Sequence, residues 1–285
     1  MKLVKSTAAM ACLSAKWDRR VAFVPTMGAL HAGHLSLITL ARKKVGSTGL
    51  VVVSIFVNPL QFGPQEDLSR YPRPLADDLR QCRSAGVDFV FHPSAVEMYP
   101  SASGVVVDEN ALARGLCGAA RPGHFRGVCT VVTKLFNLVR PDFALFGQKD
   151  YQQLAIIRRL VRELNFPVTI VAGPTQRERD GVAMSSRNAY LTPEQRREAR
   201  ALRQTLLTGA ALIRTGERSA VRIETRLRKL FRALAPNARI DYLTVVDSNN
   251  LQRRRRVDGR VVLLGAAYFG ATRLIDNEVV TVPNS

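Results

Sequence analysis

Two histidines, His31 and His34, stand three residues apart just after an apolar run that ends at Pro25. We expect both at the start of a helix, where imidazole rings and backbone N–H groups can face one ligand. Helix N-termini favour negative charge, and Gly28 and Gly33 let the backbone approach a bound group closely. A phosphate that gains charge during transfer suits these donors. The segment is our first candidate for phosphate chemistry, the alternative being two surface histidines near a turn.

Two later segments carry groups of related chemistry. Lys149 offers a compact charge that can bridge phosphates, and Asp150 beside it can accept hydrogen bonds from ribose hydroxyls. Gly147 would give access to the backbone at the same place. The segment Ser185–Arg187 adds two hydroxyls and a guanidinium fork, which suit a triphosphate. The alternative for Lys149 and Asp150 is a solvated ion pair at a strand end. The alternative for Ser185–Arg187 is an ordinary polar loop.

The string that contains the two histidines resembles the HIGH-type signature of nucleotidyltransferases and class I aminoacyl-tRNA synthetases, which bind ATP and form adenylates. Its longer form, residues 23–31, closely resembles the pantoate–β-alanine ligase family. Further segments match that family in the same order along the chain: Val57–Pro64, Arg121–Val128, Phe146–Leu154, Met184–Asn188 and Thr272–Asn277. Each match is modest alone, but together they are highly specific.

The resemblance implies a reaction in two halves. The carboxylate of pantoate attacks the α-phosphate of Mg-ATP, which gives pantoyl adenylate and pyrophosphate. The amine of β-alanine then displaces AMP to give pantothenate. Most of the catalysis would be positioning and charge stabilisation. The resemblance therefore implies ATP and Mg²⁺ as cofactors, pantoate and β-alanine as substrates, and a homodimer.

Site residues follow from the same resemblance. His34 is the candidate proton donor, and His31 and Lys149 are the other catalytic candidates. The implied ATP-binding residues are Met27, Gly28, His31, His34, Gly147, Gln148, Lys149, Asp150, Gln176, Met184, Ser185, Ser186 and Arg187. The implied substrate-binding residues are Asn58, Gln61, Arg121, His124 and Gln153.

The chemistry of the substrate-binding residues suits these roles. Gln61 and Gln153 are neutral amides that can hold pantoate without quenching the charge of its carboxylate. Arg121 and His124 are expected near the carboxylate end of β-alanine or of the adenylate. Asp77, with Asp78 beside it, is the candidate Mg²⁺ ligand, because hard cations prefer carboxylate oxygens. The alternative is a pair of acidic residues in the first turn of a helix.

Some positions depart from the family pattern. Ala32 stands where an acidic residue is usual, and Cys117 and Ala120 replace more typical acidic and small polar residues. Gln176 lies where the family usually has an apolar residue near adenine. A contact to adenine through the backbone would tolerate Gln176. These departures therefore bear on ATP affinity rather than on the reaction.

The elements that must position these residues alternate between strand-like and helical patterns. We predict strands over residues 21–24, 50–57, 87–91, 143–146 and 168–171, and helices over residues 35–41, 76–85, 128–139 and 151–164. This order predicts an α/β fold with a Rossmann-like, doubly wound parallel sheet. Ligands of such sheets bind at the carboxyl ends of the strands. The candidate residues follow directly after the predicted strands.

After residue 174 the pattern changes. Helices are predicted over residues 193–213 and 220–234, and strands over residues 240–246, 261–268 and 272–275. This favours two domains. Residues 1–174 would form a Rossmann-like domain for ATP and pantoate, and residues 175–285 a smaller α+β C-terminal domain, which the resemblance implies as a lid.

The composition is that of an ordinary globular enzyme. Of 285 residues, 46% are hydrophobic and 23% charged, which excludes disordered, collagen-like and disulfide-dense chains. The formal net charge is +19, and the excess is densest after residue 174, where Arg253–Arg256 forms its one continuous run. Acidic residues interrupt the other basic segments. We therefore favour a solvated surface over a nucleic-acid footprint.

We expect a cytoplasmic protein that binds neither nucleic acid nor a membrane. None of its cysteines has metal-site spacing, and all are expected as thiols: Cys12, Cys82, Cys117 and Cys129. No apolar run approaches the roughly 20 residues of a membrane-spanning helix. Residues 1–15 faintly resemble a signal peptide, but an N-terminal helix from Thr7 to about Ala15 is the better interpretation.

Two other functions stay open at this point. A related enzyme would form the adenylate of a different carboxylate, although Gln61, Gln153 and the segment Arg121–Phe125 favour pantoate. A basic RNA- or DNA-binding protein would use its excess charge on phosphates, and its affinity would fall steeply with salt.

Overall fold

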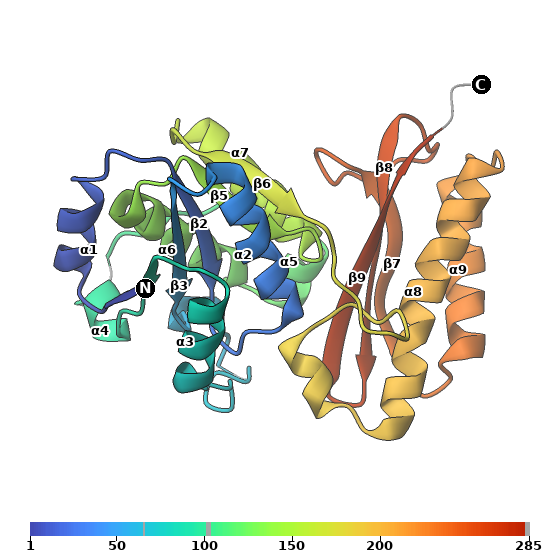
Figure 1. Cartoon of the computed structure of the whole chain (residues 1–285). Coiled ribbons are helices and arrows are strands. Elements are labelled where there is room, and N and C mark those ends of the chain that lie inside the picture. Colours follow the sequence, from blue (N-terminus) through green and yellow to red (C-terminus); the bar gives the residue numbers. More distant parts are fainter. Residues whose placement is uncertain (65, 101–103, 283–285) are drawn as a thin grey trace. The chain divides into compact units, whose positions relative to one another are not determined.

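The computed structural model describes residues 1–64, 66–100 and 104–282 (Figure 1). They divide into two compact units. The first consists of Met1–Gln148 together with Gln152–Pro174, and the second of Lys149–Tyr151 together with the chain from Thr175 onward. Three residues of the Lys149 segment thus belong to the second unit, although they stand within the first in sequence.

The first unit is built around a parallel sheet. Its strands are β1 (Lys2–Val4), β2 (Val21–Thr26), β3 (Leu50–Ile55), β4 (Phe89–Phe91), β5 (Phe143–Gly147) and β6 (Thr169–Gly173). They lie in the order β1-β4-β3-β2-β5-β6, and neighbours run parallel. The central strands β2 and β3 are buried along nearly their whole length, as expected when helices cover both faces. The predicted Rossmann-like α/β sheet is confirmed.

Helices and short turns connect these strands. They are α1 (Thr7–Ser14), α2 (Ala32–Val45), η1 (Pro59–Gln61), α3 (Leu75–Ser84), α4 (Ala95–Met98), α5 (Cys117–Ala120), α6 (His124–Val139) and α7 (Tyr151–Glu163). Alternate residues of the central strands, such as Val24 and Val53, share one core cluster with Ile38 of α2 and Cys82 of α3. Helix α6 packs against α1 and β2. This arrangement brings the β2–α2 turn, η1 and the end of β5 to the carboxyl edge of the sheet.

The second unit is a three-stranded antiparallel sheet packed against two helices. Its elements are η2 (Ser186–Tyr190), α8 (Pro193–Arg214), α9 (Ala220–Leu234), β7 (Arg239–Asp247), β8 (Arg260–Phe269) and β9 (Thr272–Thr281), with strand order β7-β8-β9. Helix α8 begins as predicted, because Thr192 and Gln195 form a capping box around Pro193. The core joins Leu206 of α8 to Leu263 of β8.

Two strands differ from the sequence prediction. Strand β1 was not predicted, because three residues at a sheet edge carry too little pattern to identify. Strand β9 is much longer than the predicted strand over residues 272–275. Its polar residues Asp276 and Asn277 hid the continuation, yet both are buried, with polar partners inside the protein.

No helix formed by the described residues combines the length and the apolar character needed to cross a membrane.

Candidate active site

His31 and His34 form the N-terminus of α2, as predicted. The N–H of Gly33 donates to Nδ1 of His31 at 3.1 Å, and the N–H of His31 donates to Nδ1 of His34 at 3.3 Å. Because both Nδ1 atoms accept hydrogen bonds, each neutral ring carries its proton on Nε2. The ring centroids are 4.1 Å apart. The helix end therefore presents two adjacent imidazoles, tilted by 37° to one another, whose Nε2 atoms are N–H donors.

A buried carboxylate holds the turn that precedes these histidines. Asp78 of α3 accepts hydrogen bonds from the N–H groups of Ala29 at 2.9 Å and Leu30 at 2.8 Å, and it is 1% exposed. Gly28 has a φ of +80°, and a Cβ there would lie 2.9 Å from Oδ2 of Asp78. Burial raises the pKa of Asp78, outweighing the lowering effect of the two N–H donors. Only glycine fits this turn against the carboxylate.

The predicted Mg²⁺ ligand, Asp77, lies on the other side of α3. It is exposed and forms an ion pair with Arg80 one turn later. Within residues 1–64, 66–100 and 104–282, no cluster of three or more His, Cys, Asp or Glu side chains could hold a metal ion. Mg²⁺ is commonly bound by one or two carboxylates together with substrate phosphates. A metal role for Asp77 stays a prediction.

Gln61 lies at the end of η1, which follows β3. Its Nε2 donates to Sδ of Met27 at 2.9 Å, and its Oε1 accepts a hydrogen bond from Nδ2 of Asn58 at 3.2 Å. Asn58 is itself fixed, because its Nδ2 donates to the carbonyl of Gly127 and its Oδ1 accepts from the hydroxyl of Tyr99. The structure thus brings the predicted residues Met27, Asn58 and Gln61 together at one edge of the sheet.

The glycine at position 127 allows α6 to pack against η1. A Cβ there would lie 2.2 Å from the carbonyl oxygen of Leu60 and 2.6 Å from the backbone nitrogen of Gln61. We expect Gly127→Ala to lower the free energy of unfolding by roughly 1–3 kcal/mol, the usual cost of overpacking. In an exposed helix, glycine to alanine would stabilise the fold by about 1 kcal/mol. We expect the opposite effect here because of the clash with η1. Urea unfolding measures the effect.

The matched control for this change is Gly115→Ala, because no atom outside its own neighbourhood lies within 4 Å of a Cβ built there. Equal stability of the two variants would contradict the close approach. Since η1 carries Gln61, the Gly127→Ala enzyme is also expected to show a raised KM for pantoate, the substrate that Gln61 is predicted to bind.

Arg121 and His124 both contact the backbone carbonyl of Gln61. Arg121 forms a bidentate ion pair with Glu66, at 2.7 and 2.8 Å, and donates to the carbonyl of Gln61 at 3.3 Å. Nδ1 of His124 lies 2.8 Å from the same carbonyl, and its Nε2 lies 3.1 Å from Arg121. The imidazole therefore donates to Gln61 and accepts from Arg121. Both predicted residues help to fix Gln61, and their contact with a substrate carboxylate stays a prediction.

Glu66 was not identified from the sequence. Burial alone would raise its pKa, but the hydrogen bonds and charge of Arg121 more than compensate, so its pKa lies below the ordinary value of 4.5. A lowered pKa in the folded state means that ionised Glu66 stabilises the fold above pH 4.5, and that this contribution is lost as the pH falls through the folded pKa.

We therefore expect Glu66→Gln to destabilise the protein at neutral pH by roughly 1–3 kcal/mol, the cost of a lost charged partner. The difference from wild type should shrink as the pH falls below 4.5. Urea unfolding across this range measures it. Asp18→Asn serves as the control, because the side chain of Asp18 is 89% exposed and lies 3.8 Å from Arg19, too far for a strong ion pair. A difference that does not change with pH would contradict the pairing.

Strand β5 ends at Gly147, and the N–H of the next residue, Gln148, donates to the carbonyl of Gly173 at 2.8 Å. Gln153 follows on α7, where it is half-buried. Its neighbour Gln152, which sequence reasoning passed over, is 5% exposed and holds the loop before α5. The Gln152 amide donates to the carbonyls of residues 112 and 115 and accepts from the N–H of Cys117.

A cavity of about 450 Å³ opens beside the β2–α2 turn. Met27, Gly28 and Asp78 line one side of it, and His92 and Arg73 line another. Nδ1 of His92 lies 2.7 Å from the carbonyl of Ile55, which fixes the ring. The first unit therefore has room for a small ligand next to the turn that the histidines follow.

The remaining predicted residues belong to the second unit. Gln176 and Met184 face each other, since the N–H of Met184 donates to the carbonyl of Gln176 at 2.9 Å. Ser185 caps η2, and its Oγ accepts a hydrogen bond from the N–H of Arg187 at 3.3 Å. Ser186 begins η2. These residues thus share one short hairpin and the turn that follows it.

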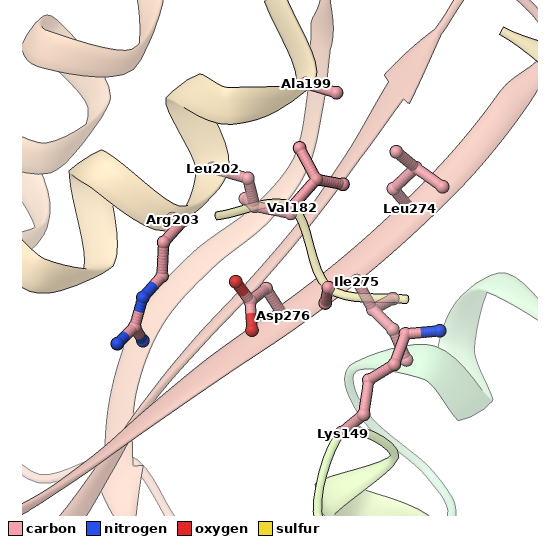
Figure 2. A pocket seen from close by; sticks show the side chains of 9 residues that line it. Lys149, Val182, Ala199, Leu202, Arg203, Leu274, Ile275 and Asp276 are labelled. Atoms are coloured by element: carbon pink, nitrogen blue, oxygen red, sulfur yellow. The ribbon is translucent and has the colours of Figure 1, made fainter. Parts of the chain in front are cut away.

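Lys149 lines a small cavity of the second unit. Figure 2 shows its side chain beside Ile275 of β9, with Asp276 and Val182 among the other lining residues. Asp150 next to it is exposed. The ammonium group of Lys149 could bind phosphate, and the exposed carboxylate of Asp150 could bind ribose hydroxyls.

Comparison with known proteins identifies the family. The model of the pantoate-beta-alanine ligase family matches residues 2–279. Pantothenate synthetase of Moorella thermoacetica is 50% identical over 285 residues, or 99% of each chain, and that of Desulfitobacterium hafniense is 52% identical over 92% of each.

Solved structures agree. That of pantothenate synthetase from Thermus thermophilus has a TM-score of 0.91 at 45% identity, with 98% of this chain and 99% of that chain covered. That of pantoate-beta-alanine ligase from Francisella tularensis, complexed with beta-gamma ATP and beta-alanine, has a TM-score of 0.79 at 32% identity, with 98% and 97% covered. This chain belongs to the pantoate–β-alanine ligase family.

Proposed function

We propose that this chain carries out its family's reaction, the ATP-dependent joining of pantoate to β-alanine through pantoyl adenylate, with the residues described above. The observation that carries this proposal is the pair of imidazoles at the N-terminus of α2. Their Nδ1 atoms are occupied by backbone N–H groups, so both rings direct N–H donors from a helix end that already favours negative charge.

In the first half-reaction, we infer that the Nε2–H of His34 donates a hydrogen bond to the phosphate as charge develops on it, with His31 beside it. Lys149 adds a positive charge for the phosphates, and Asp150 accepts from the ribose hydroxyls. The hairpin residues Gln176 and Met184 and the turn Ser185–Arg187 complete the ATP-binding set. In the second half-reaction, the amine of β-alanine attacks the acyl carbon and AMP leaves with the bonding electrons.

Gln61 is well suited to bind pantoate. Its side-chain N–H rests on the thioether sulfur of Met27, which is a weak acceptor. A carboxylate or hydroxyl oxygen is a stronger acceptor, so a substrate can redirect this donor at little cost. Because Gln61 is neutral, it orients the carboxylate and leaves its charge available for attack. Gln153 is proposed as its partner amide.

Mg²⁺ is proposed to arrive with the phosphates of ATP, which it would screen, and Asp77 is its proposed protein ligand. We further propose that the protein works in the cytoplasm as a homodimer. Its four cysteines are thiols in the structure, which suits a reducing compartment.

Pantoate-dependent exchange of labelled pyrophosphate into ATP tests the proposed function directly. The folded protein should catalyse exchange when pantoate is present, and adding β-alanine should yield pantothenate and AMP. Exchange that requires a different carboxylate would point to a related adenylate-forming enzyme, and a folded protein without any exchange would overturn the proposal. Steeply salt-dependent binding of RNA or DNA would instead favour a nucleic-acid function.

A further inference from the structure

Strand β9 holds two segments of the proposed ATP-binding set through adjacent residues. Nδ2 of Asn277 donates to the carbonyl oxygen of Lys149 at 2.9 Å. Asp276 accepts two hydrogen bonds from Arg177, at 2.8 and 2.9 Å. Asn277 and Asp276 are only 3% and 4% exposed. Because successive side chains of a strand point to opposite faces, β9 holds one segment on each face.

Asp276 holds the hairpin that contains Arg177 and Ala183. Arg177 and Ala183 form an isolated antiparallel bridge, so the ion pair with Asp276 fixes the hairpin that leads into Ser185–Arg187. Asn277, on the other face of β9, holds the carbonyl oxygen of Lys149. A substitution of Asn277 therefore removes the hydrogen bond to Lys149 and leaves the ion pair between Asp276 and Arg177 in place, although the two residues are consecutive.

The segment Lys149–Tyr151 is attached to the rest of the second unit at three points. Asn277 holds the carbonyl oxygen of Lys149, and the hydroxyl of Tyr151 donates to the carbonyl of Ser248 at 3.0 Å. The side chain of Lys149 lines the same cavity as Leu274 and Ile275 (Figure 2). This explains why residues 149–151 belong to the second compact unit while the residues on either side belong to the first.

We propose that Asn277 is a positioning residue for Lys149 in the adenylation half-reaction, an inference that rests on the proposed role of Lys149. A lysine side chain has four flexible carbon atoms, so the place its ammonium can reach depends on where its backbone is anchored. Displacement of a catalytic group by about 1 Å can cost 10²-fold in rate. Without the amide of Asn277, the carbonyl of Lys149 loses its partner and the backbone can shift.

The test uses Asn277→Ala and Asn277→Asp in the full-length enzyme. The aspartate variant keeps the size of the side chain and loses the donor, so it remains informative if the alanine variant folds poorly. Each change is made with and without Lys149→Ala. Asn249→Ala is the control, because Asn249 is exposed in a turn of the same unit. The readouts are thermal unfolding, pyrophosphate exchange, and pantothenate formation from preformed pantoyl adenylate and β-alanine.

Both Asn277 variants are expected to lower kcat for pyrophosphate exchange by about 10-fold or more, on the scale of a displaced catalytic group. They should cause no further loss in the K149A background, and the second half-reaction should keep its rate. Normal exchange in both variants, or the same fold-loss with and without Lys149→Ala, would overturn the inference. If K149A alone exchanges normally, the role of Lys149 fails first and the inference with it.

Discussion

Replacing His34 with asparagine is expected to slow pantoate-dependent pyrophosphate exchange by at least about 10²-fold while leaving the fold in place, because one catalytic donor is typically worth that much. The structure allows this separation. Nδ1 of His34 caps α2 by accepting from the N–H of His31, and the amide oxygen of an asparagine falls near the same point. Asparagine is too short to place a donor where Nε2 lies. The variant therefore keeps the cap and loses the donor.

The reciprocal variant is His34→Gln, which reaches the position of Nε2 with an N–H donor but provides no acceptor at the position of Nδ1. It is expected to retain more exchange activity than His34→Asn and to lose roughly 0.5–2 kcal/mol of stability, the usual value of an N-cap hydrogen bond. Exchange rates and urea unfolding of the two variants measure both effects. Near-normal exchange by a stable H34N enzyme would show that His34 only caps the helix.

The location of the histidines could be predicted because it depends on local sequence. His31 and His34 occupy the N-cap and third positions of α2, and a three-residue spacing after a strand suffices to place them there. The parallel sheet was predictable for a similar reason, since each apolar run alternates with a helical one. A short edge strand such as β1 leaves no comparable pattern.

Contacts between distant segments explain what sequence reasoning missed. Asp78 bonds to residues 48 and 49 positions earlier in the chain, and Glu66 pairs with a residue 55 positions later. The local sequence around Asp78 or Glu66 does not indicate which distant residue is its partner. One signal was present, however. Leu75, Asp78, Leu79 and Cys82 have the spacing of the inward face of α3, whereas Asp77 lies off that face. That spacing indicates which of the two acids is buried.

The glutamines illustrate the same limit. Gln152 and Gln153 are neighbours with identical chemistry, and the resemblance assigns pantoate to Gln153. The structure shows that Gln152 points into the protein and fixes the loop before α5, which leaves the half-buried Gln153 as the one that a ligand could reach. The helical register of α7 makes this distinction, and it can be seen only once the packing of the helix is known.

Replacing Lys149 with alanine should also lower pantoate-dependent exchange by at least about 10²-fold, because an ammonium that stabilises phosphate charge acts in the step that forms the adenylate. Lys149→Arg is expected to restore only part of the rate, since a planar guanidinium cannot take the place of a compact charge. Lys229→Ala removes one charge from an exposed position of α9 in the same unit and serves as the matched control.

The two half-reactions separate a catalytic role of Lys149 from a general electrostatic one. Pyrophosphate has left before β-alanine attacks, so K149A should form pantothenate from preformed pantoyl adenylate at close to the normal rate. A long-range effect of charge would instead slow K149A and K229A alike and weaken as salt is added, because exposed charges are screened beyond about 10 Å at 0.1 M ionic strength. Equal exchange rates for K149A and K229A would therefore contradict direct contact between Lys149 and the phosphates. Loss confined to K149A and to the first half-reaction would support that contact.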